Sequence, residues 1–385
     1  MTYAVAGVIA WVFLWFSVVK VTHLPRWAGW VITILGTLAL IGGGTALVLS
    51  RSLGATHHRL TLVVASTCLV VLMYFALSLI VVDAVNLVWW LIERHRRVNT
   101  RARLAVIRIL TVLALIVGLT VTGWGYVKNE HILLDRIELS FPELPGQFDG
   151  VTVALLTDLH VGATTRPGFL SDLVDQVNAT HPDLIVIAGD LEDGSVDELG
   201  SKMKELTKLD SSWPVFVTTG NHEFNSNAQA WIDYFDSIGL TVLDNDGAKL
   251  TREGASIEVL GINDVRGTGS LAPDLNLACR RANAGSCSSD DGVFRLLAAH
   301  EPVQALMDDD LPARLGVDLQ LSGHTHGGQL WPLGLATLIE QPVLQGVHDI
   351  GGVTTVTSRG VGGWGPPVRV GADPEIVLIT LRASA

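Results

Sequence analysis

The stretch Gly323-His324-Thr325-His326-Gly327-Gly328-Gln329 carries two histidines one residue apart. Imidazole nitrogens are common metal ligands, and the surrounding glycines let the backbone approach closely, so both rings can converge on one small region. A histidine pair of this kind also occurs by chance on protein surfaces. The pair therefore predicts a metal site only if other parts of the chain supply further ligands.

Polar residues able to bind metal follow five short apolar runs, which we predict to be buried strands. The runs cover residues 151–156, 184–188, 215–219, 294–299 and 317–321. The residues behind them are, in the same order, Thr157-Asp158-Leu159-His160, Gly189-Asp190, Gly220-Asn221-His222-Glu223, His300, and the histidine pair. Because α/β sheets assemble their sites at the carboxyl ends of strands, we expect these side chains to lie together.

The segments between the runs favour alternating strands and helices. Residues 169–178 and 228–238 have apolar positions at helical spacing, and residues 375–381 form a last apolar run. Residues 241–265 contain Asn245-Asp246-Gly247 between two strand-like pieces, which predicts a hairpin and therefore a mixed sheet.

The ligand types restrict the metal. Aspartate, asparagine and histidine with hardly a thiolate among them suit Mn²⁺, Fe or Zn²⁺ rather than Cu(I) or an iron–sulfur cluster. There are too many ligands for one ion. Two ions about 3.5–4 Å apart that share a carboxylate suit in-line attack on a phosphoryl centre by a metal-activated hydroxide.

The blocks Asp158-x-His160, Gly189-Asp190, Gly220-Asn221-His222-Glu223, His300 and Gly323-His324-x-His326, in this order, resemble the calcineurin-like metallophosphoesterase superfamily. The resemblance covers about residues 150–382. It implies an α/β fold of two mixed β-sheets flanked by helices. The tail, with Ser358-Arg359-Gly360, Pro366, Arg369 and Pro374-Glu375-Ile376, further resembles a bacterial membrane-associated branch.

The resemblance also implies a role for each matching residue. Two metal ions would be held by Asp158, His160 and His326 for the first ion, Asn221, His300 and His324 for the second, and Asp190 as the bridge. His222 would not bind metal but would face the substrate, where it would stabilise phosphoryl charge or protonate the leaving oxygen.

Other roles are open to some of these residues. Asp158 and Asp190 could cap helices that follow their strands, which is a common use of aspartate. His300 could be an ordinary hydrogen-bonded histidine. Asp193 and Glu223 could orient the ligand histidines, or they could be solvated carboxylates.

Composition divides the chain in two. Hydrophobic residues make up 49% of the 385 residues, and the mean hydropathy is +0.41. Residues 1–128 hold two acids against eleven Lys and Arg, whereas residues 129–385 hold 36 acids against 15. We predict a transmembrane region at 1–128, a linker and edge strand at 129–150, and a metallophosphoesterase domain at 151–385.

Four apolar stretches in the first part are long enough to cross about 30 Å of hydrocarbon. They are residues 3–21, 27–50, 60–80 or beyond, and 104–127. Lys20, His23 and Arg26 follow the first stretch instead of preceding it, which favours a retained span over a cleaved signal peptide. Asp83, near the end of the third stretch, is either a functional intramembrane acid or a solvated one.

The basic loops predict orientation. The connections around residues 20–26 and 94–103 hold most of the Lys and Arg of this region, so they should lie in the cytoplasm. With four spans, both termini and the acidic domain would then face outward, in a bacterial cell membrane. Cys279 and Cys287 bracket a short loop of that domain. They are either a disulfide that suits an oxidising compartment or two unpaired thiols.

Tethering to a membrane favours a phosphodiester or pyrophosphate of a lipid as substrate. Apolar residues after the last ligands, among them Leu330, Trp331, Leu333, Leu335 and Trp364, could meet acyl chains or could be ordinary packing. The acidic balance of 129–385 argues against binding of nucleic acid. A membrane sensor or transporter with a regulatory outer domain, or a binding module without catalysis, are the alternative functions.

Overall fold

The computed structural model describes residues 12–22, 25–49, 59–95, 100–283 and 287–384. The chain divides into two compact units. We name them the helical unit, which comprises Met1–Leu53, His57–Lys128 and Gly365–Val370, and the α/β unit, which comprises Gly54–Thr56, Asn129–Trp364 and Gly371–Ala385.

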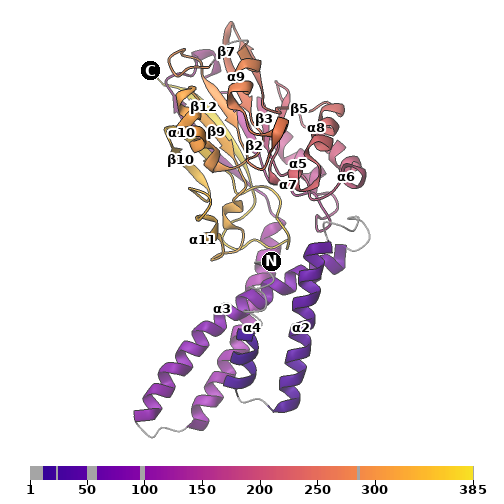
Figure 1. Ribbon diagram of the computed structural model, residues 1–385, viewed down its shortest axis with the longest axis vertical. Helices are drawn as coiled ribbons and strands as arrows, with labels where there is room; N and C mark the ends of the chain where they lie inside the picture. Colours follow the sequence, from indigo (N-terminus) through magenta and orange to yellow (C-terminus); the bar gives the residue numbers. More distant parts are fainter. Residues whose placement is uncertain (1–11, 23–24, 50–58, 96–99, 284–286, 385) are drawn as a thin grey trace. The chain divides into compact units, whose positions relative to one another are not determined.

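Apolar helices make up most of the helical unit (Figure 1). They are a π-helical turn η1 (Phe16–Val21), α2 (Arg26–Leu49), α3 (Arg59–His95) and α4 (Thr100–Asn129). Within the described residues, two stretches are long and apolar enough to cross a membrane, Arg59–Arg94 and Arg101–Asn129. Four spans were expected, and these two correspond to the third and fourth.

In the part of the chain that it describes, the structure does not identify the other two predicted spans as candidate membrane helices. The first, residues 3–21, lies largely outside the described residues. The second, residues 27–50, falls on α2, whose apolar part is the shorter Trp27–Gly42. Asp83 on α3 is half-buried and accepts a hydrogen bond of 2.5 Å from the Ser17 hydroxyl. Its carboxylate is therefore held by the protein and not only by solvent.

The helical unit also contains a piece of C-terminal sequence. Gly365–Val370 belongs to it, and the Arg369 amide donates a 3.0 Å hydrogen bond to the Gly125 carbonyl in the last turn of α4. A Cβ atom at Gly125 would lie 2.8 Å from side-chain atoms of Val368 and Val370. The helix and the late segment can meet this closely only because residue 125 is glycine.

Two six-stranded mixed sheets form the centre of the α/β unit. The first has the order β1 (Leu133–Phe141), β12 (Glu375–Ala383), β2 (Thr152–Leu156), β3 (Leu184–Ala188), β4 (Val215–Thr218) and β5 (Thr241–Val242). The second has the order β10 (Gly346–Ile350), β11 (Val353–Thr357), β9 (Leu319–Ser322), β8 (Arg295–Ala298), β7 (Ala255–Gly261) and β6 (Asp246–Arg252). Only β12 with β2, β10 with β11, and β6 with β7 pair antiparallel.

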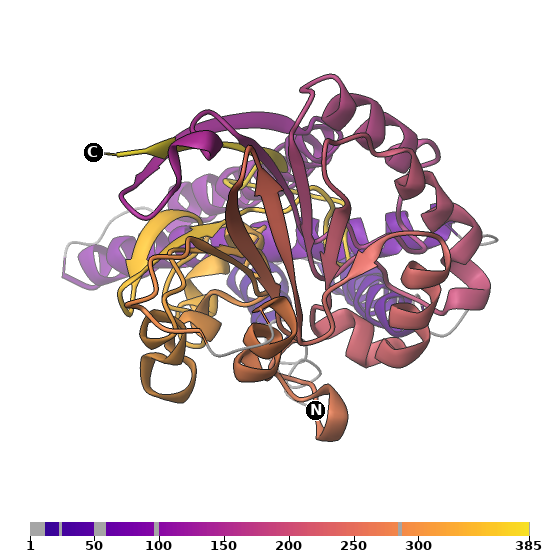
Figure 2. The same ribbon diagram turned by 90° about the horizontal axis from the view of Figure 1, so that it is seen from above.

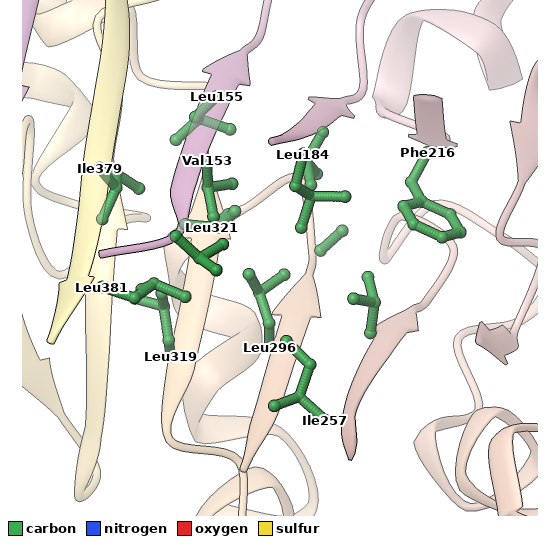
Figure 3. Close-up of a cluster of buried hydrophobic side chains, with 14 of the residues drawn as sticks. Val153, Leu155, Leu184, Phe216, Ile257, Leu296, Leu319, Leu321, Ile379 and Leu381 are labelled. Atoms are coloured by element: carbon green, nitrogen blue, oxygen red, sulfur yellow. The ribbon is translucent and has the colours of Figure 1, made fainter. Parts of the chain in front are cut away.

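The core lies between the sheets, where side chains from both point toward one another (Figure 3). Val153 and Leu155 of β2 face this layer with Leu319 and Leu321 of β9. The alternate residues of β2 point the other way, since successive side chains of a strand leave on opposite faces. Burial on both faces explains why the central strands are continuous apolar runs.

Helices cover the outer faces (Figures 1 and 2). On the first sheet they are α5 (Phe169–Asn178), α6 (Val196–Met203) and α8 (Ala228–Ser237), while α7 (Asn221–Ser226) follows the end of β4. On the second sheet they are α9 (Leu275–Asn283) and α10 (Met307–Arg314), while the short α11 (Gly334–Thr337) lies in the segment after β9. The expected pair of mixed sheets flanked by helices is therefore confirmed.

The predicted hairpin needs a correction. Its turn is not Asn245-Asp246-Gly247, because β5 before this stretch belongs to the first sheet and β6 after it to the second. The tight turn lies at Glu253-Gly254, between β6 and β7, where both residues have positive φ. Asn245 also has a positive φ of 46°, so the sequence signal marks a real bend that connects two sheets.

Leu321→Ala should lower the free energy of unfolding of the α/β unit by about 2–5 kcal/mol, because it leaves a cavity between the sheets where Leu321 is fully buried. Thermal unfolding of the full chain in detergent would measure the loss. Leu134→Ala, at a position 41% exposed on the edge strand β1, is the matched control and should cost much less. Equal losses would mean that the inter-sheet core does not hold the unit together.

Candidate metal centre

The carboxyl ends of five strands meet at one edge of the two sheets and bring together all the predicted ligands. They supply Asp158 and His160 after β2, Asp190 after β3, Asn221 and His222 after β4, His300 after β8, and His324 and His326 after β9. All are buried except His324, which is half-buried.

The first group of potential ligands is Asp158, His160 and His326, whose donor atoms lie within 4.8 Å of one another. The Nε2 atoms of His160 and His326 face each other at 2.9 Å. Asp158 Oδ1 lies 3.5 Å from Nε2 of His326 and 3.9 Å from that of His160. These are the three residues expected to hold the first ion.

The second group is Asp190, His300 and His324, again within 4.8 Å. Asn221 Oδ1 lies 2.8 Å from Nδ1 of His324, which brings the amide to the same place. Asp190 Oδ2 lies 3.2 Å from His300 Nε2 and 3.7 Å from His160 Nε2. Asp190 thus lies between the two groups, at the place where the predicted bridging carboxylate would lie.

The donor set fits two divalent cations. His300 Nε2 is fully buried and makes no hydrogen bond, although Asp190 is near. A buried polar atom left in this way is costly unless something else satisfies it. Two imidazole nitrogens facing each other need a shared proton or a cation, and buried carboxylates surround them. Asp158, His160 and His326 would hold one ion, and Asn221, His300 and His324 the other.

Electrostatics at this edge favour positive charge. Burial alone would lower the pKa of His300, but the Asp190 carboxylate outweighs it and raises the pKa well above its usual value. Burial likewise opposes a charged His160, yet Asp193, Asp190 and Asp158 raise its pKa to about 9. The same attraction holds the pKa of Asp190 well below its usual range, against the effect of burial.

Five of the seven proposed ligand residues share an uncommon backbone conformation. Asp158, His160, Asp190, His324 and His326 have φ values of 54°, 44°, 54°, 66° and 51°. Residues other than glycine seldom adopt positive φ, and such residues cluster at functional sites where the surrounding structure enforces them. This conformation makes the backbone turn sharply after β2, β3 and β9, so that the side chains of these residues converge.

Two glycines of the motifs are required because aspartate side chains approach their backbone closely. A Cβ atom on Gly220 would collide with Oδ1 of Asp190, and one on Gly323 would collide with Oδ2 of Asp158. The glycines in Gly220-Asn221-His222 and Gly323-His324-x-His326 therefore make room for the carboxylates of neighbouring strands.

A model of the calcineurin-like phosphoesterase family matches residues 151–328. A zebrafish (Danio rerio) transmembrane protein with a metallophosphoesterase domain is 30% identical over 359 residues, which are 92% of this chain and 80% of that protein. The chain belongs to the calcineurin-like phosphoesterase family. It is thus a phosphoric ester hydrolase by family.

Relatives of this phosphoesterase occur in bacteria as well. An uncharacterised metallophosphoesterase of Campylobacter jejuni is 30% identical over 281 residues, covering 72% of this chain and 71% of that protein. One from Bacillus subtilis is 29% identical and is covered over 91% of its length. Since vertebrate and bacterial relatives both match, a specifically bacterial branch stays a prediction.

Asp193 contacts two histidines of the site. Its Oδ1 lies 2.5 Å from Nδ1 of His222 and 3.4 Å from Nδ1 of His160. Burial would raise the pKa of Asp193, but these histidines lower it, so the side chain is ionised. A carboxylate on Nδ1 fixes the ring and leaves Nε2 directed at the site. Of the two roles considered for Asp193, the contacts favour orientation of histidines.

Glu223 has a role different from both of those considered for it. It is 1% exposed, so it is not a solvated carboxylate, and its hydrogen bonds go to backbone amides. It accepts from Gly220 at 2.6 Å, Leu191 at 2.7 Å and Asp190 at 3.1 Å. Glu223 therefore fixes the ends of β3 and β4 relative to each other.

The helix-capping alternative for the two aspartates finds no support in their hydrogen bonds. Asp158 accepts the amide of His324, from another strand end, at 3.1 Å. Asp190 accepts the amide of His222 at 2.7 Å. The next helices in the chain, α5 and α6, begin behind Gly168 and Ser195 instead.

A sixth strand end was missed by the sequence analysis. Asn263 and Asp264 follow β7, both are fully buried, and Oδ2 of Asp264 has no hydrogen-bond partner. Burial raises the pKa of Asp264 to about 7. The signal was an apolar run ending in polar residues, as at the other five ends, but the run had been assigned to a hairpin.

The full chain, stripped of metal and reconstituted with Mn²⁺, should bind about two ions. Asp190→Asn should lose at least about one of them, because the amide lacks the charge that a bridge between two cations needs. Elemental analysis after dialysis gives the stoichiometry, and Asp233→Asn on the exposed side of α8 is the control. Wild-type protein without bound metal would contradict the two-metal centre.

Asp193→Asn should lower kcat by about 10–100-fold, because His222 and His160 lose the carboxylate that orients them. The metal content should fall much less than kcat, and KM should change little. Asp197→Asn, an exposed position on α6, controls for charge. If kcat stayed unchanged, the contact of Asp193 with His222 would have no catalytic importance.

Proposed function

We propose that this chain is a membrane-anchored phosphoesterase that hydrolyses phosphodiesters or pyrophosphates of membrane or envelope lipids with a two-metal site. The observation that carries the hydrolytic part is the meeting of Asp158, Asp190 and their histidines at one strand edge, with the buried Nε2 of His300 left without a hydrogen bond. Two divalent cations bound there supply Lewis acidity for attack on phosphorus and offset the charge of the phosphoryl oxygens.

His222 is the residue of the chain that would act on the substrate directly. Its Nδ1 is held by Asp193, and its Nε2 lies 4.0 Å from Asp190 Oδ2, beside the two groups of ligands. With Asp193 ionised on the other side of the ring, Nε2 can donate to a phosphoryl oxygen or give a proton to the leaving oxygen. Asp193 is a positioning residue in this scheme.

Membrane anchoring rests on the two apolar helices and on connectivity. α4 ends at Asn129 and β1 begins at Leu133, so the α/β unit starts within a few residues of a candidate span. A zebrafish relative is named a transmembrane protein with this domain. We place the predicted spans at 3–21 and 27–50 in the membrane as well, which makes a four-helix region.

The proposed orientation is extracytoplasmic. Residues 94–103, from the end of α3 to the start of α4, include Arg94, Arg96, Arg97, Arg101 and Arg103. This charge favours the cytoplasm for this end of the two helices and the opposite side for the end of α4. In the α/β unit Cys279 and Cys287 form a disulfide. Disulfides persist in oxidising compartments, which supports the same side.

His222→Ala should lower kcat on an aryl phosphodiester by about 10²–10⁴-fold while both metal ions stay bound, since His222 is not a ligand in this scheme. His348→Ala, an exposed histidine on β10, is the control. The assay uses the full chain in nanodiscs with Mn²⁺ and compares aryl monoesters, aryl diesters, lipid phosphodiesters and lipid pyrophosphates. A wild-type protein that is fully metallated but inert on all of them would instead favour a membrane sensor or transporter.

A further inference from the structure

An uncharged, exposed segment begins four residues after His326. Residues 330–339, Leu-Trp-Pro-Leu-Gly-Leu-Ala-Thr-Leu-Ile, contain no charged side chain, and we call them the apolar segment. Large side chains along it are exposed: Trp331 by 65%, Leu333 by 52%, Leu335 by 58%, Leu338 by 46% and Ile339 by 85%. Contiguous exposure of this kind marks an interaction surface and not ordinary packing.

The apolar segment has a fixed base. Gln329, directly before it, exchanges two hydrogen bonds with the backbone of Trp364, of 2.9 and 3.0 Å. Gly328 and Gly334 pack backbone on backbone, because a Cβ atom on Gly328 would collide with Cα of Gly334. The start of α11 therefore packs against the residues just before the apolar segment, and Leu333, Leu335 and Leu338 are exposed.

The residues that follow Trp364 contact a candidate membrane helix. Trp364, itself 41% exposed, is followed by Gly365–Val370, which belongs to the helical unit. Within that unit Arg369 is hydrogen-bonded to Gly125, in the last turn of the candidate span Arg101–Asn129. The chain also enters the α/β unit right after this span, at Asn129. Both connections are short, so the apolar segment belongs to a unit tethered at the surface of any bilayer that α4 crosses.

We propose that the apolar segment inserts into the acyl region of the membrane in which α3 and α4 stand, and that it admits long-chain phosphoesters to the site next to it. The lipid substrate rests on the proposed function, but insertion does not. Leucine, isoleucine and tryptophan on one short element are the side chains of interfacial membrane-binding segments. With no Lys or Arg in the segment, acyl chains and not headgroup charges are what it recognises.

Insertion can be measured on the full chain in nanodiscs that hold a single copy. A nitroxide label on Ile339→Cys, in a Cys68→Ser background that leaves the Cys279–Cys287 disulfide as it is, reports collisions with oxygen and with a water-soluble nickel chelate. Buried in acyl chains, the label should favour oxygen over nickel by about tenfold relative to the control. The control is Glu253→Cys, an exposed residue in the turn between β6 and β7.

A second measurement concerns the substrate. The double variant Leu335→Asp with Ile339→Asp should lower the ratio of kcat/KM on a long-chain lipid phosphodiester to that on a soluble aryl phosphodiester by about tenfold, since the acidic pair disfavours insertion. An unchanged ratio would overturn the role in substrate entry.

The two measurements fail separately. If the Ile339 label meets nickel as often as the Glu253 label, insertion is overturned whatever the enzyme hydrolyses. If it is shielded from both reagents, the segment packs on protein and insertion is again overturned. If it is shielded from nickel alone while no phosphoester is cleaved, insertion stands and the proposed function fails.

Discussion

One buried carboxylate determines where the candidate metal centre can form. Glu223 accepts hydrogen bonds from three backbone amides, two at the end of β3 and one at the end of β4, and its side chain is buried. These bonds fix the spacing between Asp190 and the Asn221-His222 pair, which arise from different strands. The left-handed turns at the ligand residues depend on such external bonds, since nothing in an isolated loop would favour them.

The candidate metal centre also brings several buried carboxyl groups close together, which is unfavourable for folding. Asp158, Asp190, Glu192, Glu223 and Asp264 are all buried at or near the same edge, where burial and repulsion from neighbouring carboxylates raise the pKa of Glu192 to about 10 and that of Glu223 to about 7. The two-sheet core and the backbone hydrogen bonds offset this repulsion without relieving it. Divalent cations would relieve it directly, which links the stability of this edge to the ions that it would use.

Short-range patterns explain most of what could be read from the sequence. Leu184–Ala188 and Phe169–Asn178 were predicted with the bounds that the structure has, because burial on both faces and helical spacing are local properties. The ligand residues were found because each follows such a run. Their division into two groups about Asp190 came from family resemblance, and the structure brings the same residues together.

What the sequence did not reveal depends on long-range partners. β10 pairs with β11, and β11 pairs with β9, but the alternation of the two strands alone does not say to which sheet they belong. Asn245 marks a bend, but only the positions of β5 and β6 show that the chain changes sheets there. Asp264 was hidden in the same stretch.

The Gly365–Val370 segment determines what a fragment without the N-terminal helices would lack. A fragment cut at the natural-looking boundary after α4 would keep this segment but lose its packing partner, Gly125 and the helix around it. Val368 and Arg369, both fully buried in the whole chain, would then lose this contact. A soluble fragment beginning near residue 129 would therefore leave Gly365–Val370 without the helix that it packs on in the full chain.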